Sequence, residues 1–334
     1  MAIKSGAGKR GLPLVVLGSL ALVITGCAAA RESISQPWDG IAYVAMGPGK
    51  AVAVVDVTAG RVLARLPASV ESHGVAVTWD GRWVFVADLW KGDALEVVES
   101  ASGAVIGRVA VGRGSHHLTF SPDGRWLYVT RSADGRLAVV DVQVMRALKD
   151  LETGAGANYA LISPDGETAF VSNTDDDNVA VIDVAASLIT NKIPVKQAPG
   201  HMALSPNGTR LYVANEGSGT LAVIDTTKGE VIADIQVGKE PHGVAVSPDG
   251  TRAYVSSRQE GIVSEIDTST MAILRTVKVG AKPEHVENTP DGAWIVVARP
   301  EAGELVVIDT KSLGIARRIA VGKEPHQIVF APRR

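Results

Sequence analysis

The chain contains little cysteine, few aromatic residues and almost no excess charge. Cys27 is the single cysteine among 334 residues, which excludes an intrachain disulfide and a four-thiolate zinc or iron–sulfur site. Aromatic residues make up 4% of the sequence and the formal net charge is −3, with no basic block beyond the N-terminal segment. Bulk electrostatics therefore give no reason to expect nucleic-acid binding.

The sequence also lacks several short motifs that indicate a catalytic site. It contains no glycine-rich phosphate loop, no nucleophile elbow and no metalloprotease helix. An apolar run of 11 residues, from Leu14 to Ile24, is too short to span a bilayer comfortably, but it suits the core of a signal peptide. Lys4, Lys9 and Arg10 supply the positive charge that precedes such a core.

The export pattern ends in Ile24-Thr-Gly-Cys27, which resembles the bacterial lipobox. The resemblance implies cleavage before Cys27 and lipidation of that residue; the alternative is an ordinary cleavage site followed by a free, buried cysteine. Ala28, rather than Asp, follows the cysteine, which is similar to lipoproteins sorted to the outer membrane of Gram-negative bacteria. We therefore expect a signal peptide over 1–26, a lipidated tether over 27–37, a folded domain over 38–334 and a periplasmic location.

The mature chain repeats with a period near 42 residues. A turn of the Pro-Asp-Gly type recurs at spacings of 41, 43, 42, 42, 42 and 42 residues, at Asp39, Asp80, Asp123, Asp165, Asn207, Asp249 and Asp291. A period of this length without helical patterning is typical of a β-propeller with four strands per blade. In one repeat the four strands are predicted over 243–247, 252–256, 262–267 and 273–279.

The two ends of the repeat region predict how the ring closes. The first repeat starts at Trp38-Asp39-Gly40, just after the place of an inner strand. The chain ends with an inner strand inside Pro325–Pro332 that no outer strands follow. The C-terminal strand should therefore complete the first blade, which predicts an all-β, seven-bladed propeller of four-stranded antiparallel blades.

Two segments, Tyr212–Asn215 and Pro241–Gly250, closely resemble the YVTN-type repeat. Such propellers belong to the cytochrome-d1-like superfamily, which includes the haem d1 domain of nitrite reductase, haem d1 biosynthesis proteins and many exported proteins. The resemblance covers residues 38–334. It implies the fold and leaves function open, because one fold hosts many functions.

All histidines of the chain occupy two adjacent positions of the repeat, seven or six residues before the turn aspartate or its equivalent. They are His73, His116, His117, His201, His242, His285 and His326. One repeat has Asn158-Tyr159 there instead. The segment leads into an inner strand, so we expect the histidines to converge at one mouth of the central channel. Imidazoles bind transition metals, so copper or a haem-type tetrapyrrole is the expected cofactor. Alternatively, histidine is a repeat variant that caps the loop through a neighbouring backbone group.

Charged residues near the same face could hold an anionic part of a ligand. Arg131 and Arg299 replace the usual Asn at the end of the second strand, and Arg258 lies next to the equivalent Ser257. The guanidinium group suits carboxylates and oxyanions, although each arginine could instead pair with a nearby acid. Glu287 interrupts an apolar inner strand, so it should either face the channel or pair with an arginine across the blade gap.

Three functions remain open from the sequence. The first is a cell-envelope propeller that binds a metal, a tetrapyrrole or a small anionic ligand at the histidine-rich mouth. The second is a metal-dependent periplasmic redox enzyme or lyase on the same face. The third is a scaffold that binds an envelope protein or the cell wall. We expect a monomer with a small ligand or an envelope partner, and attachment to the membrane through the lipid only.

Overall fold

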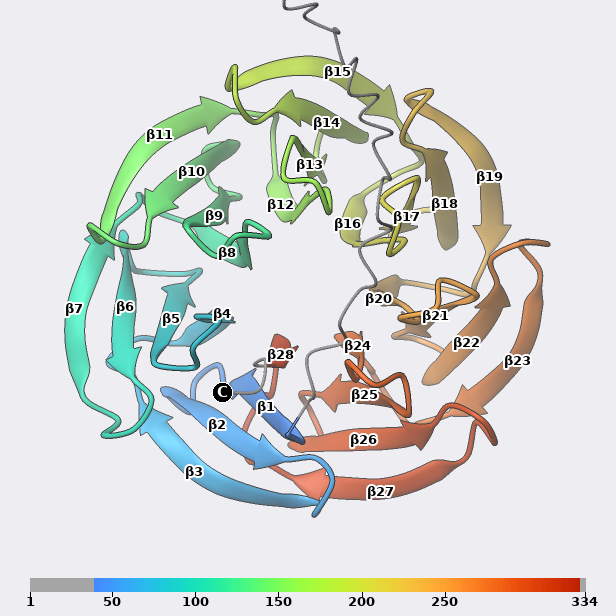
Figure 1. The fold of residues 1–334 in the computed structure, drawn as a ribbon. Coiled ribbons are helices and arrows are strands. Elements are labelled where there is room, and N and C mark those ends of the chain that lie inside the picture. Colours follow the sequence, from blue (N-terminus) through green and yellow to red (C-terminus); the bar gives the residue numbers. More distant parts are fainter. Residues whose placement is uncertain (1–38, 331–334) are drawn as a thin grey trace, which may run out of the picture. The chain divides into compact units, whose positions relative to one another are not determined.

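The computed structural model describes residues 39–330, which form 28 strands and no helix. The strands make seven four-stranded sheets in which every neighbouring pair is antiparallel. In Figure 1 the sheets follow one another around a ring, each with one strand innermost and one outermost. The predicted seven-bladed propeller is confirmed. No helix capable of crossing a membrane occurs among these residues.

We number the blades in chain order from the sheet that contains both ends of the described chain, so that blade one is β28-β1-β2-β3 and blade seven is β24-β25-β26-β27. The inner strands are β28 (Ile328–Phe330), β4 (Ser72–Val77), β8 (Ser115–Phe120), β12 (Ala157–Ile162), β16 (Pro199–Leu204), β20 (Pro241–Val246) and β24 (Val286–Asn288). The second strands are β1 (Ile41–Ala45), β5 (Trp83–Asp88), β9 (Trp126–Arg131), β13 (Thr168–Asn173), β17 (Arg210–Asn215), β21 (Arg252–Ser257) and β25 (Trp294–Arg299).

The third strands are β2 (Ala51–Asp56), β6 (Ala94–Glu99), β10 (Arg136–Asp141), β14 (Asn178–Asp183), β18 (Thr220–Asp225), β22 (Ile262–Asp267) and β26 (Glu304–Asp309). The outer strands are β3 (Arg61–Pro67), β7 (Val105–Ala110), β11 (Arg146–Glu152), β15 (Leu188–Pro194), β19 (Glu230–Gln236), β23 (Ile273–Lys278) and β27 (Ile315–Ala320).

The Pro-Asp-Gly type turn recurs because its side chains form a small hydrogen-bond network that stabilises it. In blade six, the Ser247 hydroxyl donates to Asp249 over 2.6 Å, and Asp249 accepts the Thr251 N–H over 3.0 Å. The Arg252 N–H closes the network on Ser247 at 2.9 Å. The same serine or threonine, two residues before Asp or Asn, recurs in the other blades, at Thr78, Ser121, Ser163, Ser205 and Thr289. Short polar side chains of this kind replace the backbone partners that a tight turn lacks.

The ring closes as the sequence predicts. Strand β28 pairs with β1, with Val44 opposite Ile328 and Ala42 opposite Phe330. Beyond this ladder, the His326 N–H donates to the Ala45 carbonyl at 2.8 Å. Strand β28 thus supplies the inner strand of the first blade, and each of the seven blades among the described residues has four strands.

The hydrophobic core lies between neighbouring blades. One cluster joins Val44 and Val55 of blade one to Val296 and Val307 of blade seven, all with no exposed surface. Each of the other six clusters likewise joins two successive sheets. Most of the exposed large apolar side chains lie on the outer strands, which are the least buried strands of each blade. The predicted signal peptide, the tether and Cys27 lie outside the described residues, so lipidation stays a prediction.

Candidate functional site

Two successive residues from each blade line one mouth of the central channel, where the chain enters each inner strand. The first position is occupied by His73, His116, Asn158, Gly200, His242, Glu284 and His326. The second is occupied by Gly74, His117, Tyr159, His201, Gly243, His285 and Gln327. Because the blades surround one axis, these positions form two stacked rings, which we call the upper and lower ring.

The structure brings the seven histidines into contact. The ring centroids of His73 and His326 lie 3.8 Å apart, and His285 lies 4.5 Å from His326. His201 lies 4.1 Å from His242 and 4.2 Å from His285. Tyr159 connects the remaining member, since it stacks on His117 at 3.5 Å and lies 4.7 Å from His201. Side chains up to 253 residues apart in sequence therefore share one mouth.

Hydroxyl groups at the end of the second strands hold the ring backbone in place. The Ser256 hydroxyl accepts the Gly243 N–H at 2.9 Å and donates to the Glu284 carbonyl at 2.6 Å. Ser172 of blade four and Thr130 of blade three make the same pair of bonds, one within their own blade and one to the next blade. Each bridge links two adjacent blades, so it fixes the height of the ring residues.

Three histidines bond to the backbone, as the capping alternative expects. His73 Nδ1 lies 3.4 Å from the His116 carbonyl, and His116 Nδ1 lies 3.0 Å from the Asn158 carbonyl. His117 Nδ1 accepts the Ala160 N–H at 3.4 Å. Each hydrogen bond reaches the next blade, so these three histidines stabilise the contact between neighbouring blades.

His201, His242 and His285 form a different kind of group. One ring nitrogen from each lies within 4.8 Å of the other two. The Nε2 atoms of His201 and His242 are buried and have no hydrogen-bond partner. Buried polar atoms without a partner are uncommon in folded proteins. The three imidazoles therefore have the separation of metal ligands and two unused nitrogens.

Glu216 orients the central imidazole of this group. Its Oε1 lies 2.8 Å from His242 Nδ1, so in the neutral ring Nδ1 carries the proton and Nε2 presents its lone pair. A methyl group at Gly200 would lie 2.8 Å from the same carboxylate oxygen, which shows that the absence of a side chain in the upper ring makes room for Glu216. A carboxylate that holds the remote nitrogen of a histidine is the usual support of a metal-binding imidazole.

A second acid lies beside the group. Glu284 Oε2 is 3.4 Å from His326 Nε2, and together with His242 these residues form another set of ligand atoms within 4.8 Å of one another. Arg258 Nη2 lies 3.0 Å from Glu284 Oε1, and its Nη1 lies 4.0 Å from Glu216 Oε2. Arg258 therefore bridges the two carboxylates at the mouth.

Burial keeps most of these imidazoles neutral. Removal from water lowers the pKa of His201 and of His285 well below the usual value, and the neighbouring histidines add to the effect. Burial likewise lowers the pKa of His116 to about 4. Burial raises the pKa of Glu216, but its bond to His242 and the charge of Arg258 outweigh this, so the net pKa is lowered. His201 and His285 are therefore neutral, which is the state in which an imidazole can bind a metal ion.

Family comparison agrees with this architecture. The family model described as "Lactonase, 7-bladed beta-propeller" matches residues 65–232, half of the chain. The chain belongs to the lactonase family of seven-bladed β-propellers. The model of the cytochrome D1 haem domain matches residues 206–328 of the same chain. No match to a curated protein was found.

Solved structures share the fold of this lactonase-family propeller. Hydrazine synthase of Kuenenia stuttgartiensis is 21% identical, with a TM-score of 0.71 over 85% of this chain and 99% of that one. Dihydro-haem d1 dehydrogenase NirN, in complex with DHE, is 18% identical, with a TM-score of 0.68 over 88% and 75%. A protein of unknown function from Desulfotomaculum acetoxidans is 13% identical, with a TM-score of 0.76 over 87% and 99%. At these identities the likeness concerns the fold.

Two of the three arginines expected at the mouth of this lactonase-family propeller are committed to acids elsewhere. Arg131 donates to Asp134 at 2.5 Å and to Asp150 at 3.3 Å, and Arg299 pairs with Glu304. Neither makes a hydrogen bond or ion pair with a histidine among residues 39–330. Of the three, only Arg258 lies at the candidate site, where it contacts Glu216 and Glu284.

Glu287 lies two residues after His285, within β24. Burial raises the pKa of Glu287 to about 8, and within the described part of the chain no partner of its carboxylate offsets that effect. Burial, and secondarily the charge of Glu287, raises the pKa of Tyr159 well above the usual value. Of the two expectations for Glu287, the structure favours a side chain near the channel over an arginine partner.

Two residues of the candidate site, Glu284 and Glu216, were not predicted from the sequence, because the pattern of histidines and arginines does not include them. Glu284 occupies the repeat position that is histidine in four other repeats. Glu216 occupies the position of Arg258, directly after a second strand. Comparison of equivalent positions across all repeats, rather than a search for histidines, would have placed both acids at the mouth.

Proposed function

We propose that this propeller binds a divalent transition-metal ion through His201, His242 and His285 at the mouth of its channel. The observation that carries the proposal is the set of three imidazole nitrogens within 4.8 Å of one another. Imidazole favours zinc and copper among the divalent ions. Three protein ligands leave a coordination position open, which is the arrangement of catalytic rather than structural sites.

The charged residues around the three histidines support the same function. Glu216 supplies the carboxylate partner of His242, and Arg258 lies between Glu216 and Glu284. A small anion that occupies the open position of the metal would meet Arg258 on one side. The metal-dependent redox or lyase activity that the sequence left open would use this position.

Calorimetric titration of Cu²⁺ and Zn²⁺ into the purified, chelator-treated protein tests the proposal. We expect one ion to bind wild type, and binding to weaken at least tenfold in His201→Ala and in His285→Ala. His117→Gln is the matched control, because His117 lies in the lower ring outside the proposed ligand set and Gln occupies the same position at residue 327. Equal affinity in all four proteins would refute the assignment.

A tetrapyrrole is the second candidate ligand, and one observation favours it. The cytochrome D1 haem domain match includes His242, His285 and His326. The buried, unbonded Nε2 of His242 has the chemistry of an axial ligand to haem iron, and Arg258 is the mouth residue suited to a propionate. Titration with haem, followed by absorption spectroscopy, separates the candidates: a Soret shift lost in His242→Ala supports the tetrapyrrole.

We further propose that the protein acts in the cell envelope. The lipobox-like Ile24-Thr-Gly-Cys27 supports lipidation of Cys27, and Ala28 supports the outer membrane of a Gram-negative bacterium as its destination. The lipid is then the only attachment to the membrane, and a monomeric propeller presents its mouth to small ligands or to another envelope protein.

A further inference from the structure

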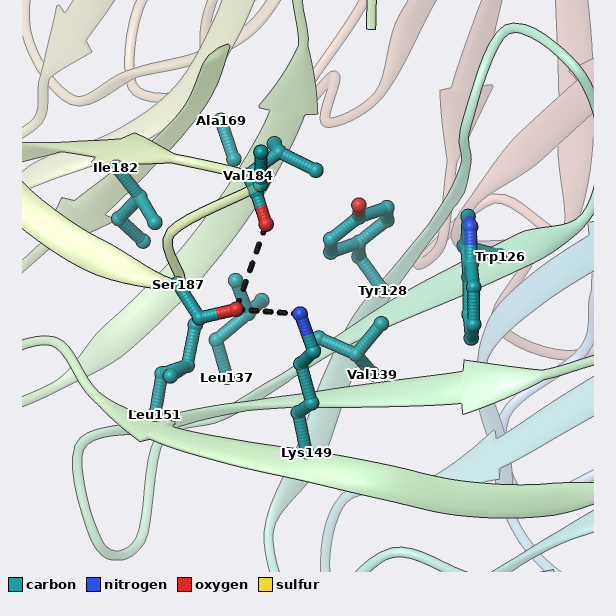
Figure 2. A pocket seen from close by; sticks show the side chains of 11 residues that line it. Trp126, Tyr128, Leu137, Val139, Lys149, Leu151, Ala169, Ile182, Val184 and Ser187 are labelled. Atoms are coloured by element: carbon teal, nitrogen blue, oxygen red, sulfur yellow. Dashed lines mark hydrogen bonds between the residues drawn. The ribbon is translucent and has the colours of Figure 1, made fainter. Parts of the chain in front are cut away.

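An apolar cavity of about 220 Å³ opens between blades three and four. Its walls come from the starts of β9 and β13, from β10 and β11, and from the end of β14 with the turn after it. None of the histidines of the channel mouth lines it. Figure 2 shows the aromatic side chains of Trp126 and Tyr128 on one side and Ile182 on the other, with Lys149 and Ser187 bonded to each other nearby. Most of the lining is hydrocarbon: Leu137, Val139, Leu151, Ala169 and Val184 complete it.

The repeat provides a matched comparison, because the gap between blades six and seven uses residues numbered 126 higher, three repeats on. There, Ile295 occupies the place of Ala169, and Leu313 occupies the place of Ser187. Ile295 is fully buried and Leu313 is 7% exposed, and both belong to the core cluster of that gap. The equivalent gap also holds a cavity, of about 390 Å³, but it is lined by polar residues such as Arg252, Glu265 and Arg275 and not by Ile295 or Leu313. Between blades three and four, Ala169 and Ser187 therefore leave open the apolar space that Ile295 and Leu313 occupy there.

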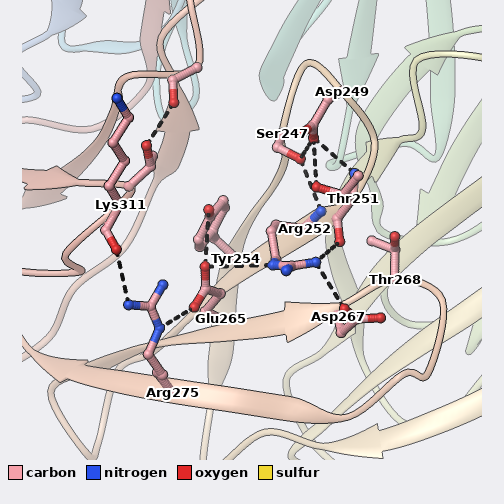
Figure 3. Close-up of polar contacts among 12 residues, drawn as sticks. Ser247, Asp249, Thr251, Arg252, Tyr254, Glu265, Asp267, Thr268, Arg275 and Lys311 are labelled. Atoms are coloured by element: carbon pink, nitrogen blue, oxygen red, sulfur yellow. Dashed lines mark hydrogen bonds and ion pairs between the residues drawn. The ribbon is translucent and has the colours of Figure 1, made fainter.

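The charge in the two gaps differs as well. Figure 3 shows Arg275, which stands at the position of Lys149, bonded to the buried Glu265 with 2.6 Å between Nε and Oε2. The position of Glu265 is Val139 in the open gap. Lys149 Nζ donates to the Ser187 hydroxyl at 2.5 Å and forms no ion pair with any carboxylate among residues 39–330. Between blades three and four the cation is therefore present, on an exposed lysine, and the buried carboxylate that accompanies it in the equivalent gap is absent.

We propose that this cavity binds a small organic carboxylate with an aromatic or branched apolar body. The apolar body would occupy the space that Ile295 and Leu313 fill in the equivalent gap. Its carboxylate would lie beside Lys149, as the carboxylate of Glu265 lies beside Arg275. Apolar cavities of about 150 Å³ accept a benzene ring, so the volume suffices for one ring with its substituent. The site is separate from the histidine mouth and does not depend on a metal there.

Three probes of one size and different charge test the proposal: benzoate, benzyl alcohol and benzylamine. We expect wild type to bind benzoate with a Kd of about 1 mM or tighter, benzyl alcohol more weakly, and benzylamine least. In Lys149→Gln, benzoate should lose about tenfold in affinity while benzyl alcohol is unchanged, because only the carboxylate interacts with the ammonium group. Chemical-shift or calorimetric titration gives each affinity.

A filled variant provides the control. Ala169→Ile with Ser187→Leu installs the residues of the equivalent gap, and Ser187 and Leu313 share the same backbone conformation, with φ of 55° and 54°. The filled variant should melt no lower than wild type and should bind none of the probes. The proposal is overturned if benzoate binds the filled variant as tightly as wild type, if benzoate shows no preference over benzylamine, or if no probe binds wild type. Should the filled variant fail to fold, the loss in Lys149→Gln decides alone.

Discussion

Glu216 has more influence on the candidate site than any other single acid, because it alone fixes which nitrogen of His242 is free. Its carboxylate reaches the mouth through the space that Gly200 leaves in the upper ring. Glu216→Gln would keep the size of the side chain and remove its charge. We expect Cu²⁺ or Zn²⁺ affinity to fall about 10- to 100-fold, with little change in melting temperature.

A matched control separates this effect from a change in overall charge. Glu230 begins an outer strand and is exposed, so Glu230→Gln removes the same charge far from the mouth. If calorimetry gives the two variants the same metal affinity, Glu216 does not orient a ligand.

The buried histidines outside the proposed ligand set make stability depend on pH. Burial lowers the pKa of His116 to about 4 and that of His117 well below 6.5, whereas both titrate near 6.5 in the unfolded chain. Folding therefore excludes protons from them, and the stability present above pH 6.5 is lost as the pH falls toward the folded values. For His116 the loss reaches at most about 3 kcal/mol at pH 4.

The chain itself suggests the substitutions that test this dependence. Asn158 and Gln327 occupy the ring positions of His116 and His117 in other blades, so His116→Asn with His117→Gln keeps polar side chains that take up no proton. Between pH 7 and pH 4.5, the melting temperature of the chelator-treated variant should fall less than that of wild type. Parallel curves would show that these histidines do not control acid stability.

At the scale of the elements, β28 is the strand on which the ring depends most. It contributes only Ile328–Phe330, but Ile328 is 1% exposed and belongs to the cluster between blades one and seven. Ile328→Asp would place an unpaired carboxylate in that core, at a cost of about 3 kcal/mol or more. We expect a large fall in the thermal or urea midpoint, or aggregation, and the same result after deletion of residues 324–334.

Ile315→Asp makes the same chemical change in an outer strand, where the side chain is 37% exposed. It should shift the midpoint by less than about 1 kcal/mol. If the truncated protein or Ile328→Asp has the same unfolding midpoint as Ile315→Asp, the role assigned to β28 is contradicted.

The strands were largely predictable from the sequence because the same pattern of apolar and turn residues recurs in seven repeats. The third strand over Ile262–Asp267 has the predicted bounds, and the inner strand of blade six begins at Pro241, two residues before the prediction, because Pro241 pairs with Ser257. The site was predictable only in part. Backbone symmetry places histidines around one mouth, but it does not determine where a long side chain points.

Arg131 and Glu216 illustrate that limit, since both stand at the end of a second strand or one residue beyond. Arg131 turns to Asp134, three residues away in the following turn. Glu216 crosses to His242 of the next blade, because Gly200 leaves the way free. Where each side chain points therefore depends on which residue lies beside it, here Gly200 for Glu216. The repeat pattern alone does not show this.

At the scale of the whole molecule, one residue decides the location of the protein in our proposal. Cys27 stands where a lipobox requires it, and anchoring through several acyl chains is stable where a single chain is marginal. Cys27→Ala should move the protein from the membrane fraction to the soluble periplasmic fraction. Fractionation followed by immunoblotting measures this, and a variant that remains as membrane-associated as wild type would remove the basis for a lipid anchor.

The pairing of β28 with β1 also governs when folding can finish. Strand β1 emerges first from the ribosome and stays without an inner neighbour until Ile328–Phe330 are synthesised. Blade one therefore remains incomplete while the strands of the six other blades are made. A chain that ended before Ile328 would leave the inner edge of β1 unpaired, and such an exposed edge is prone to pair with other chains and aggregate.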